Sequence, residues 1–290
     1  MPHHPLHKLT HLGRTIDSRD PTNLALLVLT PLVGLLGALA RYHEGAPAQL
    51  ILVAFLLGGL TALLTWALGR ELSPDHKPTA LLAVALIIPL VARGQLLDLH
   101  AVAVALLLTR VVNRSVGPPA KLGDLVFVQA LVLLLVVPRM CWPVALVAAL
   151  AFWWDSVLLD RNPRARVFSA MAIAAGMIVL SIELGPHPEQ LDACSGEMTP
   201  LLIAAALIAA LFGAVTAWQP APASKCDIVD WSLSRARVQA GMLTTLLLAI
   251  AVTAWHGRGG EVAQLYAAAP LWLTMAAVVL GRLGARARGV

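Results

Sequence analysis

Ten apolar runs, each ended by charged residues, Gly or Pro, constrain the fold of this chain more than any other feature. A helix needs about 20 apolar residues to cross a hydrocarbon core of roughly 30 Å. The runs that meet or approach this length are residues 24–41, 50–69, 79–92, 96–112, 124–138, 142–159, 167–184, 199–218, 238–255 and 266–281. We therefore predict an all-α integral membrane protein, a bundle of about ten transmembrane helices.

Composition excludes a water-soluble globular protein. Apolar residues make up 59% of the 290 residues and charged residues only 13%, against about 25% charged in a typical soluble domain. The mean hydropathy is +0.79. The third, fourth and fifth runs are the weakest, because Arg93, Asp98, Arg110 and Pro138 end or interrupt them. The third and fourth runs have an alternative interpretation as a shallow re-entrant hairpin.

The basic residues predict the orientation of the bundle. If the N-terminus is cytoplasmic, the alternation of ten spans places all but four of the 21 Lys and Arg residues in cytoplasmic loops or tails; the four on the outer side are Arg41, Arg93, Arg139 and Arg258. Cytoplasmic loops of membrane proteins collect Lys and Arg in this way. We therefore expect both termini in the cytoplasm and a multi-pass protein of the plasma (inner) membrane. The formal net charge of +5 then reflects orientation, and we expect no nucleic-acid partner.

The predicted organisation is one transmembrane domain, residues 23–282, between a cytoplasmic tail at 1–22 and a basic cytoplasmic tail at 283–290. The first tail contains His3, His4, His7 and His11; we expect a solvated tail, with a metal site as the alternative. Ten spans also divide into two halves of five, which must run in opposite directions. Inverted halves of this kind are common in transporters, which bind solute near the membrane midplane.

Ionisable and polar groups inside the spans are the first candidates for a functional site, because each is costly in a bilayer. Asp155 lies about one turn inside the cytoplasmic end of the sixth run, and Arg110 lies at a similar depth on the fourth. An ion pair or a shared cavity is one interpretation; separate snorkelling to the interface is the other. With Gln129 of the fifth run, these residues form our predicted solute-binding set for a transporter.

The cytoplasmic loops after the second, fourth and sixth runs supply a second candidate set. They combine carboxylates such as Glu71 and Asp75 with basic groups such as Arg114. Carboxylates bind Mg²⁺ and guanidinium groups bind phosphate, so this set suits an enzyme acting on a phosphorylated lipid or diphosphate. The alternative is that the basic groups fix topology and the acids neutralise them. No Walker A loop, His-Glu-x-x-His or Gly-x-Ser-x-Gly motif occurs, and no cofactor is indicated.

Three further features of the sequence lead to predictions. Asp227 is a candidate cap for a short helix with Ile228 and Trp231 toward the membrane and Arg235 and Arg237 toward lipid phosphates, with an ordinary loop as the alternative. On the outer side, Asp98 and His100 are candidates for a proton relay, beside an acidic loop at 185–198. The paired or free state of the outer cysteines, Cys141 and Cys194, stays open.

The eighth run has a stripe of small residues at every fourth position, from Ala205 through Ala209 and Gly213 to Ala217. Small residues let helices approach closely in lipid. We expect tight packing within the bundle, with contact between copies in a homo-oligomer as the alternative.

These observations lead to a transporter of a small or lipid-like solute that works by alternating access. The alternatives are a membrane-embedded enzyme at the inner leaflet and a non-catalytic subunit of a membrane complex. In number of spans and in chain length the protein resembles the ten-span drug/metabolite transporters, although it contains no motif of that family.

Overall fold

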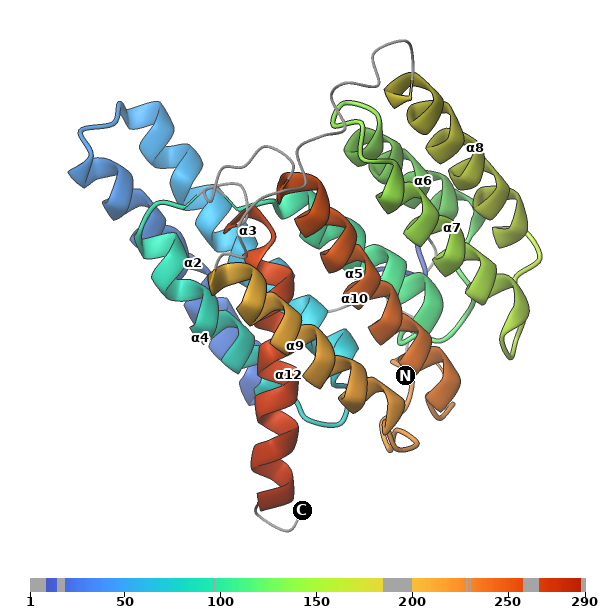
Figure 1. The fold of residues 1–290 in the computed structure, drawn as a ribbon. Coiled ribbons are helices and arrows are strands. Elements are labelled where there is room, and N and C mark those ends of the chain that lie inside the picture. Colours follow the sequence, from blue (N-terminus) through green and yellow to red (C-terminus); the bar gives the residue numbers. More distant parts are fainter. Residues whose placement is uncertain are drawn as a thin grey trace.

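The computed structural model describes residues 9–14, 19–95, 97–184, 200–227, 229, 231–257 and 266–287. Within these ranges the chain is helical, and each of the ten apolar runs coincides with a helix (Figure 1). The helices are α2 (Pro21–His43), α3 (Ala48–Leu72), α4 (Pro78–Ala92), α5 (Leu99–Asn113), α6 (Leu122–Val136), α7 (Trp142–Val157), α8 (Ala165–Glu183), α9 (Pro200–Ala217), α10 (Arg235–Gly257) and α12 (Ala269–Ala287). The prediction of an all-α fold with these elements is confirmed.

Nine of the ten described helices fall into two groups by length and composition, and α12, with 19 residues, is in neither. Five of those described, α2, α3, α8, α9 and α10, are long and apolar enough to cross a membrane. In contrast, α4, α5, α6 and α7 have only 15 or 16 residues. At a rise of 1.5 Å per residue they span about 22–24 Å, less than a hydrocarbon core of roughly 30 Å. The structure thus supports a membrane protein with five helices of spanning length.

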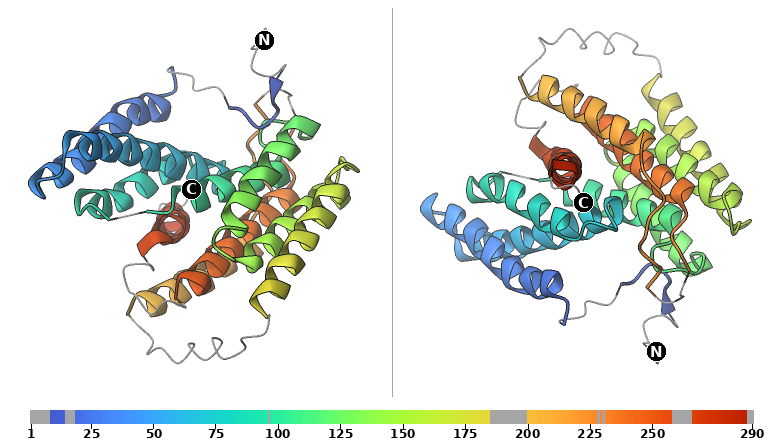
Figure 2. Two further views of the ribbon diagram at one scale, coloured as in Figure 1. Left: turned by 90° about the horizontal axis from the view of Figure 1, so that it is seen from above. Right: turned by 90° about the horizontal axis from the view of Figure 1, so that it is seen from below.

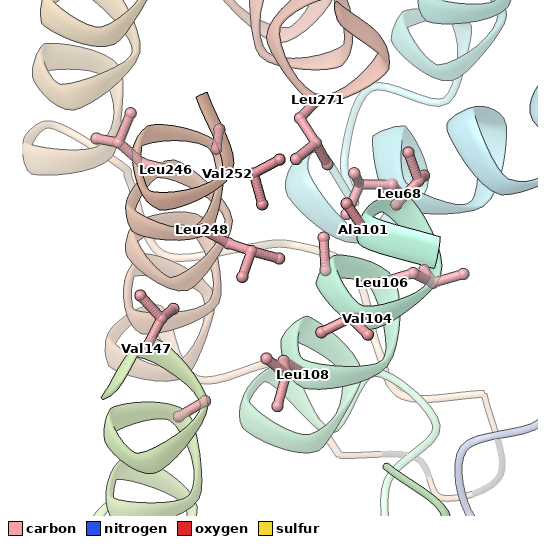
Figure 3. Close-up of a cluster of buried hydrophobic side chains, with 14 of the residues drawn as sticks. Leu68, Ala101, Val104, Leu106, Leu108, Val147, Leu246, Leu248, Val252 and Leu271 are labelled. Atoms are coloured by element: carbon pink, nitrogen blue, oxygen red, sulfur yellow. The ribbon is translucent and has the colours of Figure 1, made fainter. Parts of the chain in front are cut away.

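Two helices, α5 and α10, form the centre of the bundle. α5 packs against α3, α6, α7 and α10, and most of its residues are buried. Leu108 of α5 and Leu248 and Val252 of α10 point into the space between these two helices in Figure 3. Because protein surrounds α5, its length does not have to match the thickness of a bilayer, which explains how so short a helix occupies the middle.

The other helices pack on either side of this centre. α2, α3, α4 and α12 form one group, and α6, α7 and α8 form the other (Figure 2). α4 packs against α2, α3 and α12. Its partners differ from those of α5 except for α3, so the two do not pair as the hairpin considered from sequence.

The first five helices, α2 to α6, correspond in order to α7, α8, α9, α10 and α12 of the second half. Some corresponding helices pack alike and others do not. α2 lies along α3 as α7 lies along α8, and α5 contacts its counterpart α10. The difference is at α4, which packs against α2 and α3 of its own half and against α12 of the other, whereas both partners of its counterpart α9, α10 and α12, belong to the same half as α9.

Glycines allow the tightest helix contact, between α2 and α3. A Cβ atom at Gly34 would lie 2.6 Å from the backbone oxygen of Phe55, and one at Gly58 would lie 2.9 Å from that of Val33. Backbones that approach this closely gain van der Waals contact where lipid offers no hydrophobic drive between helices.

Large apolar side chains cover the outside of the bundle. Leu52 of α3 is 60% exposed, and Ile178 of α8 and Leu207 of α9 are each 61% exposed. Many more such residues lie on α2, α3, α8 and α9. A water-soluble protein rarely exposes apolar patches of this extent, so the outer surface agrees with a lipid environment.

The small-residue stripe of α9 is only partly used inside the chain. Ala205 is buried and Ala209 packs against the core, but Ala217 is exposed. A Cβ atom at Gly213 would meet no atom within 4 Å. Packing within the bundle therefore accounts for the first half of the stripe and leaves open space beside Gly213 among the described residues.

Candidate functional site

The loops predicted to be cytoplasmic come together at one end of the bundle, where α12 ends in Figure 1. Lys77 forms an ion pair with Asp20, and Arg14 forms one with Asp227. The Asp75 carboxylate accepts hydrogen bonds from the backbone N–H and the hydroxyl of Ser224. We call this end of the bundle the basic end.

Asp155 is the centre of a buried polar network at the basic end. Its side chain, near the last turn of α7, has no exposed surface. The Arg114 guanidinium lies 2.7 Å from the Asp155 carboxylate, and that of Arg237 lies 3.2 Å from it. The Asn162 amide donates to the other carboxylate oxygen at 3.0 Å. Charged and polar donors thus compensate the cost of burying this carboxylate.

The backbone explains why two arginines meet here. Arg114 caps the C-terminus of α5 in the left-handed conformation, with φ of 52°. Arg237, in the first turn of α10, also donates to the carbonyl oxygens of Val112 at 2.8 Å and Leu159 at 3.0 Å. The last carbonyl groups of a helix lack partners in the helix and carry partial negative charge. Arg237 therefore connects the ends of α5 and α7 with α10.

A second ion pair joins α3 to α5. The Arg110 Nε atom donates to Glu71 Oε1 at 3.0 Å, and Arg110 also donates to the backbone oxygen of Leu12 at 2.9 Å. The Glu71 side chain is fully buried, and its Oε2 atom has no hydrogen-bond partner in the described structure. The pair considered from sequence, Asp155 with Arg110, does not form, because each residue has a nearer partner of opposite charge.

Two polar cavities open between these charged groups. The first, which we call the Glu71 cavity, has a volume of about 260 Å³. It is lined by Arg14, Arg70, Glu71, Pro74, Lys77, Asn113, Ser115, Ser224, Lys225, Asp227 and Leu233. Four of these side chains are basic and two are acidic, so the lining carries an excess of positive charge.

The second, the Arg114 cavity, has a volume of about 400 Å³. It is lined by Asn113, Arg114, Gly117, Leu159, Asp160, Cys226, Trp231, Ser232, Leu233, Ser234 and Arg237. Asn113 and Leu233 line both cavities, so the two adjoin.

A segment before α10 contributes to both cavities; we call its described residues, 224–227, 229 and 231–233, the strap. A backbone bridge joins Lys225 to Ser232, and the Cys226 N–H donates to the Trp231 oxygen at 2.9 Å. The predicted short helix is therefore wrong, and its alternative, a loop, is confirmed. Arg237 is 3% exposed and contacts protein rather than lipid phosphates; Ile228 lies outside the described residues.

Burial and neighbouring charge shift the pKa of three groups near these cavities. Burial raises the pKa of the Asp227 carboxyl, and the nearby Arg14 guanidinium opposes that shift. Burial also raises the pKa of the Cys226 thiol, with the Asp227 charge adding to the effect. At Asp20, the hydrogen bond from Lys77 holds the pKa well below its usual range. These shifts favour the protonated thiol at Cys226 over the thiolate.

The predicted site residues occupy different positions around the cavities. Glu71 lines one and Arg114 lines the other. The other three lie behind the cavity walls. Arg110 hydrogen-bonds to Glu71 and Asp75 to Ser224, both in the wall of the Glu71 cavity. Asp155 hydrogen-bonds to Arg114 in the wall of the other cavity. Gln129 is buried on α6 away from both, and neither of its amide atoms has a hydrogen-bond partner in the part of the chain described.

Two important members of the site, Arg70 and Arg237, are not among the site residues predicted from the sequence. Arg70, at the end of α3, is 7% exposed and lines the Glu71 cavity, although it reads as an interfacial loop residue. For Arg237 the sequence predicts a place at the membrane surface. Its spacing from Arg235 on the first turn of α10 offered a signal, because two residues two apart on a helix face different directions.

At the opposite end, Asp98 pairs with Arg139 and lies 3.4 Å from His256. The predicted relay from Asp98 to His100 does not form, because the His100 ring contacts the Leu131 carbonyl oxygen at 2.9 Å. The acidic loop, Cys194 and three of the four N-terminal histidines lie outside the described residues. Within the described ranges, no three His, Cys, Asp or Glu side chains gather as a metal site.

Comparison of this chain with the models of known families, with curated proteins and with solved structures gives no match.

Proposed function

We propose that this chain is a ten-span, multi-pass protein of the plasma membrane that transports a small or lipid-like solute by alternating access. In this proposal both termini are cytoplasmic and the basic end faces the cytoplasm. The observation that carries the proposal is the pair of adjoining polar cavities, bordered by buried charges, in an otherwise apolar bundle. Buried ionisable groups beside a cavity in a membrane protein mark a solute pathway by default.

The arrangement of helices supports a rocking motion. α2, α3, α4 and α12 form one body and α6, α7 and α8 form another, with α5 and α10 between them. In alternating access, one body moves against another around a fixed site. The Glu71 cavity lies where the first body meets α5, so a rotation of that body about α5 would close or widen it.

Each predicted residue has a role in this mechanism. Glu71 and Arg114 contact the solute from the two cavities. Arg110 and Asp155 hold those side chains in position, and Asp75 holds the strap through Ser224. Gln129, whose amide has no partner among the described residues, is proposed to meet the solute farther along the pathway.

One observation favours the enzyme alternative. Carboxylates and basic groups lie side by side in the Glu71 cavity, an arrangement that suits a phosphorylated lipid or diphosphate at the inner leaflet. That enzyme would use Glu71, Asp75 and Arg114 and would require a divalent metal ion. The subunit alternative, and a homo-oligomer, rest on the part of the α9 stripe near Gly213 that has no close neighbour.

A transport assay in proteoliposomes distinguishes these functions. Vesicles are incubated with a defined mixture of phosphorylated, carboxylated, amino and neutral metabolites, and their contents are measured by mass spectrometry. We expect at least one solute to accumulate, and Arg110→Ala to abolish that accumulation. Arg41→Ala is the matched control, because Arg41 forms an exposed ion pair at the other end. Conversion of a metabolite or lipid without accumulation would establish the enzyme, and no change in any solute would contradict transport of these classes.

A further inference from the structure

Arg70 is the most informative residue of the Glu71 cavity, because it is a buried cation without an anionic partner. It is 7% exposed, and in the described structure it forms no ion pair within 4.0 Å. Its guanidinium is held by long hydrogen bonds to Thr22 (3.3 Å) and Asn23 (3.4 Å) and lies over the Trp66 ring at 5.4 Å. Its Nε atom is buried and has no partner among the described residues. A buried charge in this condition is costly unless a ligand supplies the opposite charge.

Other groups of the same cavity make an anion the best fit. Arg14, Lys77 and Lys225 add positive charge, against the carboxylates of Glu71 and Asp227. The Ser115 hydroxyl lines the cavity, is buried, and has no hydrogen-bond partner in the described ranges. The volume of about 260 Å³ is near the lower limit of ligand pockets, roughly 300 Å³. It therefore suits a small anion or an anionic head group.

Glu71 narrows the class of anion. Its Oε2 atom is buried in the wall of this basic cavity and accepts no hydrogen bond in the part of the chain described. A carboxylate oxygen only accepts hydrogen bonds when ionised, so it repels an anion that has no proton to donate. A phosphate group that retains a P–OH satisfies it, while its other oxygens accept from Arg70 and Ser115. Sulfate at neutral pH has no such proton.

We infer that the Glu71 cavity binds a phosphate group that keeps one P–OH, with Arg70 neutralising its charge and the Glu71 carboxylate accepting the hydrogen bond that the P–OH donates. This inference rests on the proposed function for the choice of site and adds the class of solute. The group belongs either to a soluble phosphate or to the head group of a phosphorylated lipid. The chemistry at Arg70 and Glu71 is the same in both cases.

Calorimetric titration of the full-length protein in detergent at pH 6 tests the inference. The probes are inorganic phosphate, glycerol 3-phosphate, a short-chain phosphatidic acid and sulfate. At this pH a phosphomonoester, with a second pKa of about 6, keeps its P–OH in roughly half of the molecules. We expect phosphate or one of the esters to bind at least about tenfold more tightly than sulfate, as one charge-assisted hydrogen bond implies. Tighter binding of phosphatidic acid than of glycerol 3-phosphate would identify the lipid source, and the reverse order the soluble source.

Three variants test the assigned roles. Arg70→Gln should weaken phosphate binding about tenfold or more, whereas the control Arg41→Gln should leave it unchanged. Glu71→Gln should remove the preference for phosphate over sulfate, because an amide can donate to sulfate. Since Glu71 also pairs with Arg110 and its variant risks misfolding, Ser115→Ala provides a second test and should weaken phosphate and sulfate binding equally, by a few fold.

The outcomes separate this inference from the transport proposal. Equal binding of sulfate and phosphate, no phosphate binding, or full binding by Arg70→Gln would overturn the inference, and transport of a neutral or cationic solute would remain tenable. Selective phosphate binding by a protein that accumulates no solute in vesicles would establish the anion site and contradict transport.

Discussion

The Arg237 guanidinium on α10 donates a 3.2 Å hydrogen bond to the Asp155 carboxylate on α7, 82 residues earlier in the chain. Arg114 at the end of α5 contacts the same carboxylate oxygen. One fully buried acid thus connects the two central helices to α7, and both arginines depend on it for charge compensation. The network stabilises the basic end, beside the Arg114 cavity.

Asp155→Asn should destabilise the protein strongly. The substitution keeps the shape of the side chain but leaves two buried guanidinium groups without their counter-charge. Removal of one partner from a buried ion pair typically costs about 3–5 kcal/mol. We expect a clearly lower thermal midpoint in detergent, measured by the intrinsic fluorescence of the tryptophans.

Asp160→Asn is the matched control for that substitution. Arg114 donates to the backbone carbonyl oxygen of Asp160, not to its carboxylate. Asn also tolerates the left-handed conformation of this residue, φ of 59°. The thermal midpoint of Asp160→Asn should therefore match that of the unmodified protein. Equal midpoints for Asp155→Asn and the unmodified protein would show that the buried network is not a stabilising feature.

The helices of this fold were predictable because each apolar run is bounded by charge, Gly or Pro. Periodicity and length need no tertiary information, and Pro78 and Trp142 begin helices close to the expected positions. The position of α5 at the buried centre of the bundle was harder to predict from the sequence. Asp98 and Arg110 made the fourth run look like a weak span, whereas they lie at the ends of a short helix that other helices surround.

The site was predictable in its location but not in its pairs. Charges at the ends of spans indicated the basic end, and Glu71 and Arg114 do line its cavities. Which acid pairs with which arginine depends on helix rotation and on the left-handed turn at Arg114, and sequence spacing does not report either. The strap was harder still, because its conformation follows from contacts with distant residues such as Ser115 and Asp75.

Gly241→Ala should destabilise the contact between α5 and α10. A Cβ atom at Gly241 would lie 2.0 Å from the Asn113 Oδ1 atom, whose amide nitrogen donates to the Glu71 backbone oxygen at 3.0 Å. Relief of this overlap requires movement of Asn113 or of the helices, and overpacking of a filled core typically costs about 1–3 kcal/mol. The thermal midpoint in detergent should fall.

Gly213→Ala on α9 is the control, since its new Cβ would have no neighbour within 4 Å. Alanine favours helix by up to about 1 kcal/mol over glycine, so this variant should be as stable as the unmodified protein or slightly more stable. If both alanine variants raise the thermal midpoint, the stability of the protein does not depend on the close approach of α5 and α10 at Gly241.

Thiol labelling should report the proposed orientation. In a background with the three native cysteines replaced by serine, we introduce Ala48→Cys near the start of α3 or Arg164→Cys before α8. Both positions are exposed and lie at opposite ends of the bundle. A membrane-impermeant maleimide added to intact cells should label the cysteine at 48 and spare that at 164. In inside-out vesicles the pattern should reverse.

Labelling of both positions from one side would contradict a bundle that crosses the membrane between them. Labelling of only the cysteine at 164 in intact cells would instead place the basic end outside, against the tendency of Lys and Arg loops to stay cytoplasmic. The proposed cytoplasmic access to the Glu71 cavity would then be wrong.

Ser224→Ala should loosen the strap over the two cavities. The Ser224 hydroxyl donates to the Asp75 carboxylate at 2.7 Å, and its backbone N–H donates to the same oxygen at 2.8 Å. The variant removes the first hydrogen bond only, and at an exposed position this should cost about 1 kcal/mol of local stability. Where cleavage follows local opening, that cost corresponds to about fivefold faster trypsin cleavage after Lys225. Mass spectrometry of timed digests of the purified protein measures this rate.

Ser232→Ala, on the opposite strand of the strap, separates this effect from a general loss of serine hydroxyls. Ser232 takes part in the backbone bridge to Lys225, which does not involve its side chain, so cleavage of this variant should proceed at the rate of the unmodified protein. Equal acceleration in both variants would mean that the Asp75 hydrogen bond does not hold the strap. Unchanged cleavage in both would mean that other contacts, such as the ion pair of Asp227 with Arg14, limit its opening.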